Sequence, residues 1–154
     1  MVAFITFITL FHALLYFMDE HIFHRERGLS PSEVKSGMFD GILFVLTVGL
    51  TIFSTYSTGL AYLYITLATL SCLSIIKHEY FYPDYLSKRE RITHALLYII
   101  HPLILYAFYN SWKSNLFDEN LMYWMLQLAY FALAFKSASF YIIYWNYVYE
   151  RESE

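Results

Sequence analysis

The sequence predicts an all-α integral membrane protein with about five transmembrane helices in a single domain, residues 1–154. Of the 154 residues, 58% are hydrophobic and 15% are charged, whereas soluble domains carry about 25% charged residues. The charged side chains also gather in short segments and leave five uncharged stretches, at residues 1–18, 41–76, 92–112, 120–135 and 137–149. Because a helix needs about 20 apolar residues to cross a bilayer, these stretches predict membrane spans.

We expect the helices at residues 2–24, 31–54, 59–82, 88–112 and 119–149. The uncharged stretch 41–76 is too long for one span, and the run 54–59 in its middle is typical of a turn. The first helix lacks the basic flank and the cleavage site of a secretory signal, so we expect it to remain as a span. The first four helices are expected to form two hairpins, to which the fifth helix is added.

The distribution of basic residues predicts the orientation in the membrane. Seven of the ten Lys and Arg residues lie in the two loops at 25–35 and 77–91. The positive-inside rule places such loops in the cytoplasm. We therefore expect the N-terminus outside, the C-terminus in the cytoplasm and a location in the bacterial inner (plasma) membrane.

Composition also excludes several classes of protein. The single cysteine, Cys72, excludes a disulfide framework and a cysteine-rich zinc module. The net charge of −3 provides no basic surface for nucleic acid. The expected partner is the lipid bilayer, and the sequence does not define an oligomeric state.

Carboxylates and imidazoles gather at one predicted membrane face. Glu20 and His24 end the first helix and Glu90 and His94 begin the fourth, and residues four apart share a helix face. The second and third helices each add one glutamate. Four carboxylates and two imidazoles are the ligand set of ferritin-like di-iron and di-manganese bundles, although those use a three-residue spacing. The sequence thus predicts a dinuclear site at the cytoplasmic edge, with the ligands Glu20, His24, Glu33, Glu79, Glu90 and His94.

Two simpler interpretations remain open for this cluster. Ser30 with Glu33, and Ser87 with Glu90, have the spacing of capping boxes, in which the glutamate bonds back to the serine amide. Charged residues also collect at membrane edges without any metal. Asp19, His21, His78 and Asp84 flank the proposed ligands, as outer-shell contacts or as solvated loop groups.

A second polar layer is expected deeper in the membrane. His12, Asp40 and His101 each lie about two helical turns, or about 11 Å, from the first group. They can form a supporting network, a proton path or a second site, or they can simply hold the helices together. Lys136 is the one charge inside the fifth helix, and it either snorkels to the interface or balances the carboxylates.

One segment carries a resemblance to known sequences. The run Asp19-Glu20-x-x-Phe23-His24-Arg25-x-Arg27-Gly28-Leu29 resembles a motif in small, uncharacterised bacterial multi-pass membrane proteins. The resemblance implies a helical membrane fold and brings no known activity with it.

The ligand set favours a membrane metalloenzyme. Carboxylate and imidazole ligands suit iron, with manganese or zinc as alternatives, so we expect two iron ions and the oxidation of a lipid-soluble substrate such as an acyl chain or quinol. The alternatives are a metal-ion carrier or sensor, and a non-catalytic subunit of a membrane complex. A zinc hydrolase and a haem held by His12 and His101 also remain open.

Overall fold

The computed structural model describes residues 2–81, 86–116 and 120–149, with the backbone alone for residues 2 and 77–81. These residues form helices and contain no strand. Five helices, of 19 to 28 residues, are long and apolar enough to cross a membrane, which confirms the expected number. Their bounds are close to those expected from the uncharged stretches.

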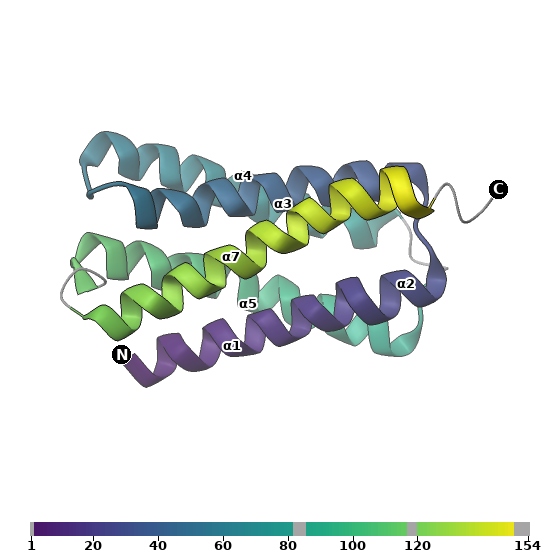
Figure 1. The fold of residues 1–154 in the computed structure, drawn as a ribbon, viewed down its shortest axis with the longest axis horizontal. Helices are drawn as coiled ribbons and strands as arrows, with labels where there is room; N and C mark the ends of the chain where they lie inside the picture. The colour runs from purple at the N-terminus through teal and green to yellow at the C-terminus, as the bar shows by residue number, and fades with distance from the viewer. Residues whose placement is uncertain (1, 82–85, 117–119, 150–154) are drawn as a thin grey trace.

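The first span is continuous but changes its pitch near its end. It consists of α1 (Val2–Met18), the π-helical turn η1 (Asp19–Phe23) and α2 (His24–Arg27). The other spans are α3 (Pro31–Phe53), α4 (Thr58–Phe81), α5 (Lys88–Lys113) and α7 (Leu121–Ile143), the last extended by a second π-helical turn, η2 (Tyr144–Val148). Successive spans run in opposite directions, so α1 begins and α7 ends at opposite ends of the bundle (Figure 1).

The spans do not pack simply in the order of the chain. α1 packs mainly against α5, whereas α3 packs against α4 and α7, which crosses the front of the bundle diagonally (Figure 1). Of the two expected hairpins, the second, α4 with α5, is a packed pair, but the first is joined by its loop without extensive packing. The first and fourth spans, which carry most of the expected ligands, are therefore direct neighbours.

Close contact between α3 and α7 depends on two glycines. A Cβ added to Gly37 would lie 2.5 Å from the Tyr141 ring, and one added to Gly41 would lie 3.2 Å from the Cβ of Ala138. Gly37 and Gly41 form the small-xxx-small pattern that lets helices approach closely in membranes. The approach brings Tyr141 into the bundle, where its side chain is 1% exposed.

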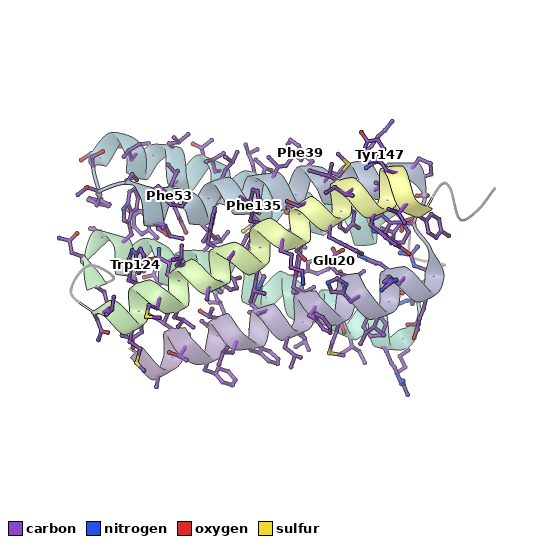
Figure 2. The ribbon with its side chains drawn as sticks, viewed as in Figure 1. Glu20, Phe39, Phe53, Trp124, Phe135 and Tyr147 are labelled. Carbon is purple, nitrogen blue, oxygen red and sulfur yellow. The ribbon has the colours of Figure 1, made fainter. Side chains whose placement is uncertain are left out.

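The outer surface of the bundle is apolar. Phe39, Phe53, Phe135 and Tyr147 lie on the outside in Figure 2, and they are between 56% and 70% exposed. Many other large apolar side chains face outward as well. An apolar surface of this extent marks a membrane or protein contact rather than a water-facing surface.

Candidate metal centre

The π-helical turn in the first span decides which side chains share a face. The His24 amide donates to the carbonyl oxygen of Asp19, five residues earlier. In a π-helix this wider turn brings residues five apart into line, whereas an α-helix aligns residues four apart. Asp19 is therefore placed beside His24, with 3.5 Å between Asp19 Oδ2 and His24 Nε2.

α5 completes the group from the opposite side of the bundle. His94 Nε2 lies 2.8 Å from Asp19 Oδ1, and Glu90 lies one turn earlier on the same helix. One ligand atom from each of Asp19, His24, Glu90 and His94 lies within 4.8 Å of the others, and all four residues are buried. Atoms that ligate one transition-metal ion at about 2.1 Å lie at most about 4.2 Å apart. Small side-chain movements would therefore let the four atoms bind one ion.

We name the four residues Asp19, His24, Glu90 and His94 the metal cluster. Glu20 lies beside this cluster. Figure 2 shows the Glu20 side chain between α1 and its neighbours, and the residue is 3% exposed. Its Oε1 lies 3.8 Å from His24 Nδ1, longer than a direct hydrogen bond. Within the described part of the chain its Oε2 is buried without a hydrogen-bond partner. A buried carboxylate oxygen in that state can accept a cation or a water.

A small cavity lies where these side chains converge. Its volume is about 50 Å³, and Asp19, Glu20, His24 and His94 line it. A water needs only about 10–15 Å³ of this kind of space, so the cavity has room for an ion together with a water. Asp40 and His101 of the deeper layer line the same cavity.

Arg27, the last residue of the first span, pairs with two glutamates. Its Nη1 lies 2.9 Å from Glu33 Oε1, and its Nε donates to Glu90 Oε1 at 3.2 Å. Both glutamates are buried, whereas the Arg27 side chain is 20% exposed. Arg27 thus joins α2, α3 and α5 at the edge of the metal cluster.

The two predicted capping boxes differ in the structure. The Ser30 amide donates to Glu33 Oε2 at 2.8 Å and the Glu33 amide donates to Ser30 Oγ at 3.3 Å, which is a complete capping box. Both carboxylate oxygens of Glu33 are therefore bonded, to Ser30 and to Arg27, outside the metal cluster. Ser87 Oγ accepts from the Glu90 amide, but the Glu90 carboxylate turns to Arg27 and the cluster.

The remaining residues of the predicted site have other positions. Asp19, expected in an outer shell, is a central member of the cluster. His21 is only partly buried and lies between the rings of Phe17 and Phe140, on the side of α7. The side chains of His78 and Glu79, and the whole of Asp84, lie outside the described residues.

The deeper layer is a continuous line of hydrogen bonds through all five spans. His12 Nδ1 lies 2.8 Å from the Tyr130 hydroxyl, and His12 Nε2 lies 3.3 Å from His101 Nδ1. His101 Nε2 lies 2.9 Å from Ser71 Oγ, which is 3.3 Å from Asp40 Oδ1. Sequence reasoning found the ionisable members, but not the serine and tyrosine that connect them.

One arrangement of protons satisfies every bond in this line. Ser71 donates to the Asp40 carboxylate, so its oxygen accepts from His101 Nε2. His101 Nδ1 then accepts from His12 Nε2, and His12 Nδ1 accepts from Tyr130. Both imidazoles are neutral in this arrangement. The position of each ring proton is assigned here from the hydrogen-bond partners of the ring. The line leads from α7 to the cavity beside the metal cluster.

No protein-family model, curated protein or solved structure matches this chain. The fold and the site therefore define its class: a helical bundle with five candidate membrane spans and a buried Asp/His/Glu/His group that could hold a metal ion.

Proposed function

We propose that this chain is an integral membrane metalloprotein that binds a transition-metal ion at Asp19, His24, Glu90 and His94. The observation that carries the proposal is the convergence of these four buried ligand atoms within 4.8 Å. Two imidazoles and two carboxylates suit iron, manganese or zinc, and the group contains no thiolate that would favour a softer metal. Glu20 is a further ligand within reach of the same cavity.

The number of ions depends on residues outside the cluster. A dinuclear centre needs bridging carboxylates, and both oxygens of Glu33 are already bonded to Ser30 and Arg27. We therefore propose one ion at the metal cluster.

We further propose that the bound ion is iron and that the protein is an oxidoreductase. The site is buried in an apolar bundle, so a lipid-soluble substrate such as an acyl chain or a quinol suits its surroundings. The hydrogen-bonded line from Tyr130 to Asp40 suits a quinol as the substrate, because oxidation of a quinol to a quinone gives up two electrons and releases two protons that must leave the membrane interior. The metal would supply the redox chemistry.

A metal carrier is less well supported by the packing. Beyond the His12 layer, Ile8, Val48, Ile104 and Phe108 fill the centre of the bundle and are at most 2% exposed. An ion released from the cluster would have to pass these apolar side chains.

We further propose that the cluster faces the cytoplasm of a bacterial inner membrane. The basic residues Arg25, Arg27 and Lys35 lie at this end of the bundle, and the positive-inside rule places basic loops in the cytoplasm.

Metal analysis of the purified protein tests the proposal. The chain is purified in neutral detergent and its bound iron, manganese and zinc are measured per chain. We expect about one ion per chain, and loss of it in His24→Ala and His94→Ala. His21→Ala is the matched control, because it removes an imidazole from the same span outside the cluster. Absence of metal in monodisperse wild type, or equal metal in all three variants, would refute the proposal.

A further inference from the structure

A second pocket lies between α1 and α7, away from the metal cluster. Its volume is about 160 Å³, and its apolar walls are formed by Ala13, Phe17, Phe44, Leu133 and Ala134. Phe17 and Leu133 are each 55% exposed, so the pocket opens on the outer surface of the bundle, between the two helices. In a membrane this surface faces the lipid, and a ligand would enter sideways from the bilayer.

Lys136 lies on the rim of this pocket at an unusual depth. It is 15 residues from Leu121 and 12 from Val148, so it lies roughly 22 Å and 18 Å along the helix from the ends of the span. The whole span is roughly 42 Å long, about 12 Å more than the hydrocarbon core. With this excess shared between the two ends, Lys136 still lies roughly 12–16 Å inside the core along the helix, farther than a lysine side chain extends. Lys136 is exposed, and among the described residues it forms no ion pair with a carboxylate. A charged group at this depth requires a partner, because lipid does not solvate it.

The composition of the pocket indicates the charge of that partner. Lys136, His21 and Ser137 offer hydrogen-bond donors in the lining of the pocket, which contains no Asp or Glu. The remaining walls are mostly apolar. The pocket is thus complementary to a molecule with a small anionic group and an apolar body.

We propose that this pocket binds a long-chain carboxylic acid, whose carboxylate pairs with Lys136 and whose alkyl chain lies between α1 and α7. A two-chain phospholipid has a larger head group that stays at the membrane surface, whereas a carboxylate is small enough to lie at the depth of Lys136. This site goes beyond the proposed metal centre and does not depend on it, because the two share no ligand residue.

Fluorescence titration with cis-parinaric acid, a fluorescent fatty acid, tests the site in the full chain purified in neutral detergent. Binding to Lys136→Gln should be weaker by about tenfold or more, because the carboxylate loses its charged partner. Lys136→Arg keeps the charge and should bind nearly as well as wild type. Lys35→Gln removes an exposed lysine from α3 outside the pocket and should not change binding. Oleate should displace the probe, and oleyl alcohol should displace it poorly.

A second variant tests the apolar part of the pocket. Ala134→Phe places a ring in the cavity and should abolish binding while Lys136 remains. Equal affinity of wild type and Lys136→Gln, unchanged binding by Ala134→Phe, or displacement by oleyl alcohol as strong as by oleate would overturn the proposal. Stronger displacement by phosphatidylglycerol than by oleate would also overturn it, since Lys136 would then bind a phospholipid head group. Metal content is measured on the same samples, so a failure of the fatty-acid site can be distinguished from a failure of the metal proposal.

Discussion

His12 and His101 meet ring to ring inside the bundle, with 3.3 Å between Nε2 of the first and Nδ1 of the second. His12 also lines the pocket between α1 and α7, whereas His101 lines the cavity beside the metal cluster. The pair therefore connects the pocket between α1 and α7 to the cavity beside the metal cluster.

Removal of one imidazole should destabilise the bundle. His12→Phe leaves the partner groups on His101 and Tyr130 without their hydrogen bonds, at a cost of about 1–3 kcal/mol for each buried group left unsatisfied. We expect a lower unfolding midpoint in denaturant for this variant. His21→Phe is the control, because His21 is partly buried and contacts two phenyl rings. Equal midpoints for the two variants would contradict the network.

Asp19 should contribute more to metal affinity than Glu20 does. The π-helical turn places Asp19 against both histidines of the cluster, whereas Glu20 contacts His24 at 3.8 Å. Asp19→Asn should therefore lower metal affinity by about 10-fold or more, which is the scale of losing even a supporting contact at a metal site. Glu20→Gln should lower it less. Competition with a metallochromic chelator measures both affinities, and the reverse order would show that the α-helical register governs binding.

Metal affinity should fall as the pH falls. Imidazole and carboxylate ligands must be deprotonated to bind a metal, so protons compete with the ion. We expect metal retained after dialysis at about pH 8 to be released at about pH 5, where unperturbed imidazole is protonated. Return to the higher pH with added metal should restore the content. Release that does not depend on pH would argue against histidine ligands.

Gly37 should be sensitive to a single methyl group. Gly37→Ala places a Cβ within 2.5 Å of the Tyr141 ring, and overpacking of this kind costs about 1–3 kcal/mol. The change should also displace Tyr141 from His24, whose Nδ1 lies 3.5 Å from the tyrosine hydroxyl. Gly59→Ala is a matched control, because no atom lies within 4 Å of its added Cβ. Thermal unfolding should separate the two, and equal stability would refute the close contact.

The orientation in the membrane can be tested by cysteine labelling. In a Cys72→Ala background, single cysteines at Ser57 and Ser114 should react with an impermeant thiol reagent in intact cells. A cysteine at Ser32 should react only after the cells are opened. All three positions are exposed. Labelling at Ser32 alone in intact cells would reverse the proposed orientation.

The helices could be predicted from the sequence because uncharged stretches of the right length are a direct consequence of the bilayer thickness. The role of Asp19 could not be predicted, because it depends on a π-helical turn that no residue pattern in the sequence indicates. An α-helical spacing selects Glu20 as the partner of His24, and one extra residue in the turn selects Asp19 instead.

The deeper layer shows a similar limit. His12, Asp40 and His101 were noticeable because ionisable residues are rare inside a membrane. Ser71 and Tyr130 are common residue types in such helices, so only the packing reveals that they connect the layer. The pairing of α1 with α5 was also not readable from chain order, because these two helices are not neighbours in the sequence.

The order of the ligands along the chain has a consequence for biosynthesis. Asp19 and His24 belong to the first span, and Arg27 at its end pairs with Glu33 at the start of the second. Glu90 and His94 belong to α5 and are synthesised more than sixty residues after His24. A ribosome-bound chain that ends before α5 therefore carries half of the cluster, and the proposed site would have its complete set of ligands only once α5 has been synthesised. At the proposed site, metal would therefore bind late in assembly, after α5 has been synthesised.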